Sequence, residues 1–306
     1  MRTEKLASLD LSVVGMGCNN FGRALDADGT AAVVNASLDE GITFFDCADV
    51  YGGAQSEGFL GRALGPRRDE AVVATKFGIE LPGVLAGGAS PDYVKSAITD
   101  SLQRLGMDHV DLYYLHTPDE KTPIADTLGA MTDLVRQGLV REIACSNFSA
   151  EQMLQAEAVS AELGLARFVT TQVEYSLVKR EPQTNGVLES CRETGMGLVP
   201  YYPLASGLLT GKVGRGATPQ GRLTMDRYQH YLSDENFDLV ERLEAVAAEL
   251  DRTLLELAFG WLLAQPEVPS VIAGATKPEQ VRSNAAAAER PLSADEVTAV
   301  DKALTA

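Results

Sequence analysis

The 306-residue sequence predicts an α/β fold, a (β/α)8 barrel of the TIM type with an N-terminal β-hairpin and extra C-terminal helices. Eight short apolar runs follow one another, most of them about 30 residues apart, which is the length of one strand–helix unit. The runs are continuously apolar rather than alternating, as is typical of parallel strands covered on both faces. Polar or charged residues follow most of the runs directly, and in such barrels the carboxyl ends of the strands carry the active site.

The N-terminal residues predict a short hairpin over residues 1–12 and a first buried strand over residues 13–17. This strand carries Gly15-x-Gly17, which would also suit a doubly wound dinucleotide-binding sheet. However, the third glycine of that motif would fall at Asn20, and no acidic residue is clearly placed after the second strand. The doubly wound sheet is therefore the less favoured alternative.

The later strands alternate with helices whose ends carry capping residues. Ser90-Pro91 gives one helix an N-cap followed by proline at its first position, and Gly106 ends that helix. The strands are expected to end at residues 46, 76, 116, 147, 172, 201 and 274. The helices are expected over residues 30–40, 56–64, 91–105, 122–138, 149–159, 181–191, 237–250, 254–263, 280–288 and 294–304. A long loop spans residues 203–233, and no linker interrupts the series, so we expect one domain over residues 1–306.

Composition excludes several function classes. The net charge of −17 argues against nucleic acid and against an anionic membrane surface, since both attract clustered basic residues. No apolar run approaches the ~18 residues of a membrane span. The four cysteines form no CxxC pair and no secretory leader is apparent, so a cytoplasmic location is expected. The three histidines show no metal-ligand spacing, and no metal is expected.

Four polar residues at or just beyond strand ends suggest proton-transfer chemistry: Asp46, Tyr51, Lys76 and His116. A tyrosine hydroxyl titrates near ~10 in water, and a nearby lysine cation would lower that pKa. Asp46 would keep Lys76 charged and in place, while His116 would donate a hydrogen bond to a substrate oxygen. Together they predict a general acid aimed at a carbonyl oxygen. Taken singly, the four also fit structural roles: a helix cap, a loop aromatic, a rim cation and a satisfied core histidine.

In type, order and approximate spacing, these four residues resemble the catalytic tetrad of the aldo-keto reductases, over nearly the whole chain. The resemblance is to the branch that includes bacterial enzymes and potassium-channel β-subunits. It implies that Tyr51 is the general acid, that Lys76 lowers its pKa, that Asp46 orients Lys76, and that His116 orients the carbonyl. The family often has threonine where Cys47 stands, which leaves the tetrad untouched.

The same resemblance implies a cofactor, NADP(H), with NAD(H) as a further possibility. Ser146, Asn147 and Gln172 would bind the nicotinamide carboxamide, and Tyr201 would stack on the ring. The remaining expected cofactor residues belong to the loop over the pyrophosphate and to the adenosine end: Pro203, Leu204, Gly207, Lys212, Arg222, Gly274, Thr276, Gln280 and Asn284. Relatives often have arginine at the position of Thr276 and glutamate at that of Ser283, which leaves the choice between the two cofactors open.

The sequence thus predicts an NADP(H)-dependent oxidoreductase that interconverts a small-molecule carbonyl (aldehyde, ketone or sugar) and an alcohol. Asn20, Phe21, Phe77 and the segment 225–231 could line its substrate pocket. The alternative is a cofactor-sensing regulatory subunit that binds a partner and turns over slowly. The substrate, the physiological direction and the oligomeric state stay open.

Overall fold

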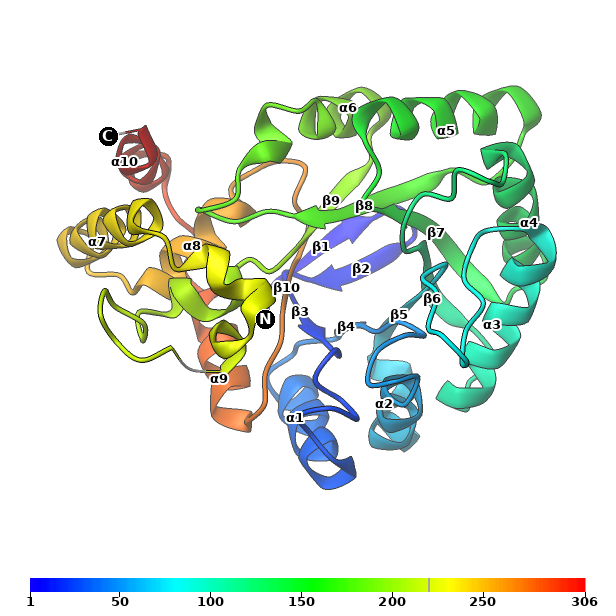
Figure 1. Cartoon of the computed structure of the whole chain (residues 1–306), viewed down its shortest axis with the longest axis horizontal. Helices are drawn as coiled ribbons and strands as arrows, with labels where there is room; N and C mark the ends of the chain where they lie inside the picture. Colours follow the sequence, from blue (N-terminus) through cyan, green and yellow to red (C-terminus); the bar gives the residue numbers. More distant parts are fainter. Residues whose placement is uncertain (220, 306) are drawn as a thin grey trace.

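The computed structural model describes residues 1–219 and 221–305. Its centre is a parallel sheet with strand order β10-β3-β4-β5-β6-β7-β8-β9. The first and last of these strands, β10 and β9, lie side by side, so the sheet curves into a nearly closed barrel (Figure 1). The strands are β3 (Val14–Gly17), β4 (Phe44–Asp46), β5 (Val72–Phe77), β6 (Val110–Leu115), β7 (Val140–Ser146), β8 (Phe168–Glu174), β9 (Gly197–Tyr201) and β10 (Val271–Ala273). The predicted eight-stranded barrel is confirmed.

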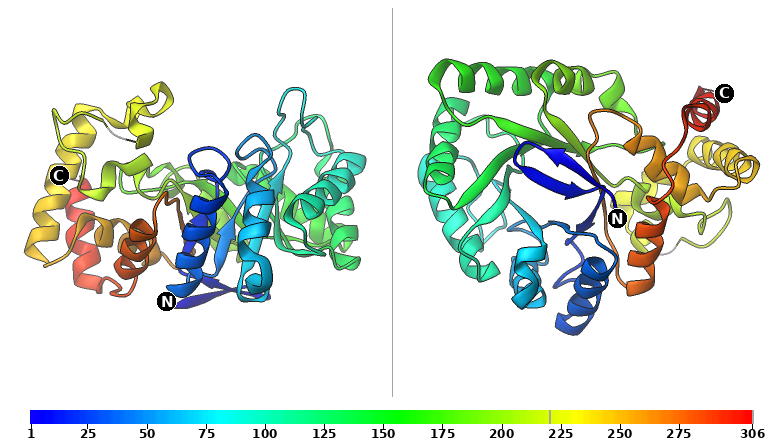
Figure 2. Two further views of the ribbon diagram at one scale, coloured as in Figure 1. Left: turned by 90° about the horizontal axis from the view of Figure 1, so that it is seen from below. Right: turned by 180° about the vertical axis from the view of Figure 1, so that it is seen from behind.

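The predicted hairpin, β1 (Thr3–Leu6) and β2 (Leu9–Ser12), closes one end of the barrel. Its leucines pack in one buried cluster with inward-facing strand residues such as Phe44 and Leu112. Figure 2 shows the hairpin at one end of the molecule and the long connecting loops at the opposite end. Burial of these leucines removes water from the lower end, so a ligand can enter only from the carboxyl ends of the strands.

The helices form the outer layer around the barrel (Figure 1). They are α1 (Ala27–Asp39), α2 (Ser56–Leu64), α3 (Pro91–Leu105), α4 (Ile124–Arg136), α5 (Ala150–Leu163), α6 (Val187–Thr194), α7 (Asp234–Glu249), α8 (Leu254–Leu263), α9 (Pro278–Ala287) and α10 (Ala294–Thr305). The cap predicted for α3 is present: the Ser90 hydroxyl accepts from the Tyr93 N–H, and Gly106 takes the left-handed conformation. Among the described residues, no helix has both the length and the apolar character needed to cross a membrane.

Several element ends differ from the sequence prediction by a few residues, as where β8 runs to Glu174 rather than ending at Gln172, and two segments differ in kind. The helix expected over residues 181–191 is split into a 3₁₀ turn, η2 (Glu181–Gln183), and α6, which begins only at Val187. Gly186, with φ of +86°, interrupts the helix because its backbone is left-handed. The expected loop over 203–233 contains three 3₁₀ segments, η3 (Ala205–Thr210), η4 (Gly221–Thr224) and η5 (Asp226–Tyr231).

Alternation along the strands decides which side chains enter the barrel. Phe44 and Ala74 belong to the inner cluster, whereas Phe45 and Val73 belong to the outer layer beneath the helices. Successive strand residues point to opposite faces. Asp46 and Lys76 therefore share the inward face of Phe44 and Ala74, at the mouth of the barrel.

The contact between α2 and α3 gives a stability prediction. A Cβ atom added at Gly61 would lie 1.9 Å from the Leu105 carbonyl oxygen, which is backbone and cannot rotate away. We expect Gly61→Ala to lower the free energy of unfolding by about 1–3 kcal/mol or more. As a matched control, a Cβ at Gly129 in α4 meets nothing within 4 Å. Gly129→Ala should thus be neutral or stabilising by up to about 1 kcal/mol. Equal changes in unfolding free energy for the two variants, measured by urea titration, would contradict this packing.

Candidate active site

A cavity of about 890 Å³ opens at the carboxyl ends of the strands. It extends from the expected catalytic residues to the expected adenosine end. The expected site residues that line it are Asp46, Tyr51, His116, Ser146, Asn147, Gln172, Tyr201, Pro203, Leu204, Gly207, Lys212, Arg222, Gly274, Thr276 and Gln280. Lys76 is fully buried beneath this lining, and Asn284 is buried in α9 and does not take part in it.

A buried ion pair forms the floor of the cavity. The Lys76 ammonium has no solvent exposure and lies 2.6 Å from Asp46 Oδ2. It also donates to the Cys47 carbonyl oxygen at 2.7 Å. The second Asp46 oxygen, Oδ1, accepts from Gln172 Nε2 at 2.7 Å. Each atom of the pair thus has a partner, which is the condition under which charges can be buried.

Tyr51 and His116 lie directly above this pair. The Lys76 ammonium is 5.1 Å from the centre of the Tyr51 ring. The Tyr51 and His116 ring centres are 5.9 Å apart and nearly perpendicular. The loop that carries Tyr51 turns through Gly52, where a Cβ atom would come within 2.4 Å of the Phe21 carbonyl oxygen. Only glycine allows this close approach. The structure thus brings the four expected catalytic residues together at the mouth of the barrel.

The pKa of Tyr51 corrects one expectation. Burial of its hydroxyl, with the Asp46 carboxylate adding to the effect, raises the pKa of Tyr51 well above its ordinary value. The sequence had predicted a lower pKa, caused by Lys76. The physical reason for the difference is that the hydroxyl is buried, and the loss of its water has the largest effect on its pKa. Tyr51 is therefore fully protonated at neutral pH and available as a proton donor.

His116 is held neutral. Burial, followed by the positive charge of Lys76, moves the pKa of His116 well below its ordinary value. Its backbone is fixed on both sides, since its N–H donates to the Phe77 carbonyl at 2.8 Å and its own carbonyl accepts from Asn147 Nδ2 at 3.0 Å. Its ring nitrogen Nδ1 has no partner among the described residues. A neutral imidazole donates a hydrogen bond from the ring nitrogen that carries the proton and accepts one at the other nitrogen.

Ser146, Asn147 and Tyr201 form a connected polar group beside the pair. Ser146 Oγ donates to the Gln172 carbonyl oxygen at 3.0 Å. Asn147 Nδ2 donates to Ser146 Oγ at 3.1 Å, and Asn147 Oδ1 accepts from the Tyr201 hydroxyl at 2.9 Å. Asn147 adopts φ of +61°, an uncommon backbone conformation of the kind found at functional sites. The network fixes the amide and hydroxyl groups in advance of any ligand.

The far end of the cavity holds cations. Arg222 donates to the side-chain oxygens of Asn19 and Asn20, the latter at 3.0 Å. The guanidinium also lies 5.8 Å from the centre of the Tyr202 ring. Ser206 Oγ lines the same region and, within the described ranges, is a buried hydroxyl without a partner. Arg222 also lies beside the turn after β10, since a Cβ atom at Gly274 would be 3.6 Å from Arg222 Nη2.

Some residues that line the cavity were not predicted from the sequence, and some residues predicted to line it do not. Asn19 and Tyr202 line the cavity, although neither was expected as a site residue. Asn19 could have been found, because it lies two residues beyond the end of β3, where a polar residue follows the strand. Of the candidates for the substrate pocket, Asn20 and Met225 line the cavity. The others, Phe21, Phe77, Tyr228 and Tyr231, pack in the outer core.

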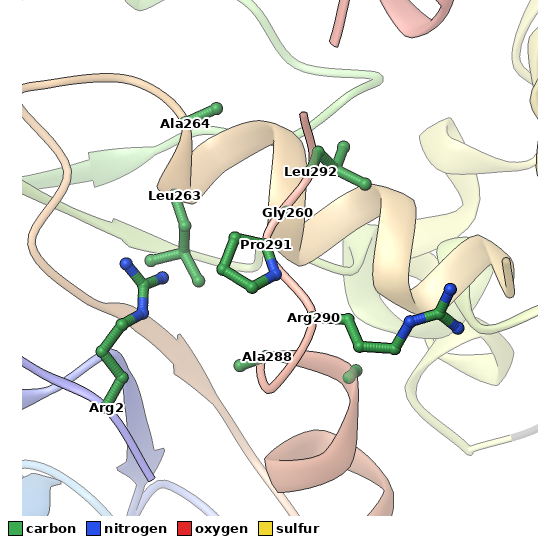
Figure 3. A pocket seen from close by; sticks show the side chains of 9 residues that line it. Arg2, Gly260, Leu263, Ala264, Ala288, Arg290, Pro291 and Leu292 are labelled. Carbon is green, nitrogen blue, oxygen red and sulfur yellow. The ribbon is translucent and has the colours of Figure 1, made fainter. Parts of the chain in front are cut away.

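A second, smaller cavity of about 130 Å³ lies between the ends of α8 and α9. Figure 3 shows Arg2 and Arg290 on either side of it, with Leu263 and Pro291 between them. Arg2 pairs with Glu4 at 3.2 Å, and Arg290 pairs with Glu256 at 3.5 Å. Both charges are thus neutralised by neighbours, and the remaining lining is mostly apolar.

Comparison with known proteins agrees with this geometry. The model of the aldo/keto reductase family matches residues 13–305. The chain belongs to this family. It is 36% identical to a probable voltage-gated potassium channel subunit beta of Oryza sativa subsp. japonica, covering 86% of this chain and 83% of that protein. It is 33% identical to probable aldo-keto reductase 1 of Glycine max, over 96% of this chain and 86% of the relative.

A third relative is L-glyceraldehyde 3-phosphate reductase of Escherichia coli (strain K12), 30% identical over 91% of this chain and 84% of that protein. The aldo-keto reductase family and the reductases among its relatives show that the chain is of the oxidoreductase kind. Members of the family generally use NAD(P)H. Family membership thus agrees with the fold and with the polar residues around the cavity.

One buried carboxyl group near the candidate active site takes no part in the Asp46–Lys76 ion pair. Asp49 is 1% exposed, and neither of its carboxyl oxygens has a partner among the described residues. Its backbone N–H donates to the Lys76 carbonyl at 3.1 Å, and Tyr51 follows two residues later. Burial, with the nearby Glu57 carboxylate adding to it, raises the pKa of Asp49 to about 7. Glu57 itself pairs with Arg104 at 2.6 Å.

This group predicts a pH-dependent stability. Since the pKa of Asp49 rises on folding from 3.8 to about 7, the folded chain holds a proton that the unfolded chain has lost over that range. The contribution to stability is therefore full below pH ~4 and falls as the pH rises to about 7. Relative to the parent, Asp49→Asn should become progressively more stable between these values, by up to a few kcal/mol, and change no further above pH ~8. A difference in unfolding free energy that does not vary with pH would contradict the assignment.

Proposed function

We propose that the protein is an NADP(H)-dependent oxidoreductase that interconverts a carbonyl compound and an alcohol, with Tyr51 as general acid and base. The proposal rests on the position of Tyr51. This residue lines the cavity, and its ring lies above the buried Asp46–Lys76 pair and beside neutral His116. A protonated phenol, a fixed cation and a neutral imidazole are the groups that reduction of a carbonyl needs.

The residues have distinct parts in this proposal. A nicotinamide dinucleotide, when bound, supplies the hydride to the carbonyl carbon. Tyr51 gives its proton to the carbonyl oxygen, and the phenolate that remains is stabilised by Lys76, whose ammonium is 5.1 Å from the ring centre. His116 orients the same oxygen by a hydrogen bond from its ring. In the oxidative direction Tyr51 takes the proton back.

Removal of the Tyr51 hydroxyl tests the proposal. Tyr51→Phe keeps the ring in place but has no transferable proton, so we expect turnover of carbonyl substrates to fall about 10² to 10⁴-fold. Cofactor binding should stay within about twofold of the parent, because the phenyl ring still fills its site. A panel of aldehydes and ketones, followed at the nicotinamide absorbance, measures the change. Near-parental rates would exclude Tyr51 as the acid.

The cavity also supports the cofactor part of the proposal. Its volume is at the upper end of the range for small-molecule sites. Lys212 and Arg222 bring positive charge to the lining, and the buried Ser206 hydroxyl lacks a partner among the described residues. Thr276 and Gln280 lie at the start of α9, where backbone N–H groups favour phosphate. Arg282 is less available, since it pairs with Glu40 and Glu279, each at 3.7 Å.

We predict tighter binding of NADPH than of NADH. The extra phosphate needs local cations on a chain whose net charge of −17 repels it. A charge-assisted contact is worth ~1.5–3 kcal/mol, so the preference should be roughly ten- to a hundredfold. Fluorescence titration of both cofactors should show a smaller preference in Arg222→Ala or in Lys277→Ala, since Lys277 directly precedes α9, with Arg282→Ala as the control. Equal dissociation constants in the parent would refute the preference.

A further cation suggests the substrate class. Arg23 lines the cavity together with Val50 and Ile79, and its loop packs against Gly52, next to Tyr51. Within the described ranges no carboxylate lies within ion-pair distance of it, although the chain has more acidic than basic residues. We infer that the substrate has an anionic group besides its carbonyl. The relative named L-glyceraldehyde 3-phosphate reductase is named for a substrate of this kind.

A pair of matched substrates tests this inference. 4-Carboxybenzaldehyde and its methyl ester have the same carbonyl and differ mainly in charge. We expect Arg23→Gln to raise KM for the acid roughly two- to fivefold, as for a solvated ion pair, and to leave KM for the ester unchanged. Arg62→Gln is the control, because Arg62 packs over Phe59 outside the cavity. The inference fails if both substrates respond alike.

The second candidate function is a cofactor-sensing regulatory subunit. The observation that favours it is the 36% identity to a relative named as a potassium channel subunit beta. Such a protein would bind the cofactor, turn over slowly and form a stable complex with a partner. A turnover assay beside a search for a stable hetero-complex separates the two candidates.

A further inference from the structure

The side chain of Gln172 reaches the ion pair from across the barrel. Asp46 ends β4 and Gln172 lies in β8, four positions away in a sheet of eight strands, so the two strands face each other across the barrel. The bond from Gln172 Nε2 to Asp46 Oδ1 is 2.7 Å long, and both residues are at most 3% exposed. No other hydrogen bond of Asp46 Oδ1 occurs among the described side chains.

An irregularity in β8 aims this side chain inward. Ile143 of β7 pairs with Phe168 of β8, and Cys145 pairs with Thr171. Two residue steps along β7 therefore match three steps along β8. Phe168 belongs to the outer layer, and strict alternation would place Gln172, four residues later, on that outer face. The extra residue reverses the alternation, and Gln172 pairs with inward-facing Ser146 instead. Bulges beside active sites commonly redirect a side chain in this way.

The two ends of the Gln172 amide face different groups. Its Nε2 is engaged by Asp46, whereas its Oε1 has no hydrogen bond within the described part of the chain, and the residue lines the cavity. Its backbone carbonyl accepts from Ser146 Oγ at 3.0 Å and from the Asn147 N–H at 2.9 Å. One residue therefore joins the floor of the site to the polar group beside it.

We propose that Gln172 is a positioning residue that holds the Asp46 carboxylate and thereby couples cofactor binding to the Asp46–Lys76 pair. Lys76 donates to one oxygen of the buried Asp46 carboxylate, and Gln172 donates to the other. Loss of either donor would leave a buried acceptor without a partner, which costs free energy. A donor that binds Oε1 polarises the amide and strengthens its bond to Asp46, because linked hydrogen bonds reinforce one another. The coupling to cofactor rests on the proposed function, whereas the holding of Asp46 does not.

A double-mutant cycle on the cofactor-free protein tests the holding role. We expect Gln172→Met and Asp46→Leu to be non-additive, with a coupling factor of at least threefold in the unfolding equilibrium constant. Thr171→Val is the matched control, since Thr171 lies next in the strand on the opposite face, and it should be additive with Asp46→Leu. If Asp46→Leu does not fold, Asp46→Asn replaces it with the same criterion. A coupling factor below threefold overturns the proposal.

Kinetics test the coupling. In Gln172→Met, turnover of a carbonyl substrate should fall ten- to a hundredfold, and its pH profile should shift, because one oxygen of the buried Asp46 carboxylate then lacks its donor. A residue that only contacts the cofactor would instead raise the NADPH dissociation constant and leave the profile unchanged, which would overturn the coupling. If the parent reduces no carbonyl at all, the proposed function fails, and the cycle above still decides whether Gln172 holds Asp46.

Discussion

A lysine side chain with no solvent exposure keeps its charge only when other groups replace the water it has lost. At the mouth of this barrel, Asp46 and the Cys47 carbonyl replace that water for Lys76. The pair fixes the ends of β4 and β5 relative to each other, and Tyr51 and His116 are placed above it. The cavity, its polar side groups and the loop that carries Tyr51 all depend on this ion pair.

The two ends of the barrel are built for different tasks. The β1–β2 hairpin fills the lower end with leucines, which form a buried apolar cluster with inward-facing strand residues. At the upper end, the segments between β9 and α7 cover the cavity, and Arg222 links them to Asn19 and Asn20 in the first loop. Burial of the Asp46–Lys76 pair between these two ends strengthens the electrostatic contact within it.

The sequence predicted the barrel, and it predicted that the candidate site residues would share one face of it. Both predictions follow one rule, that apolar strands end in polar residues at that face. Asp46, Lys76 and His116 were found by that rule, and the structure brings them together with Tyr51. The inward turn of Gln172 could not be predicted, because it depends on the register between β7 and β8. The raised pKa of Tyr51 was also missed, since the burial of its hydroxyl is a property of packing. One helix was expected over residues 181–191, and Gly186 interrupts it because its backbone is left-handed.

The most direct test of the account is to follow the hydride itself. The parent protein would be incubated with a carbonyl substrate and NADPH that carries deuterium at the transferable position of the nicotinamide. The account predicts that deuterium appears on the carbinol carbon of the product, detected by mass spectrometry, and that its rate of appearance falls at least a hundredfold in Tyr51→Phe. Product without deuterium, or equal rates of transfer in the two proteins, would contradict it.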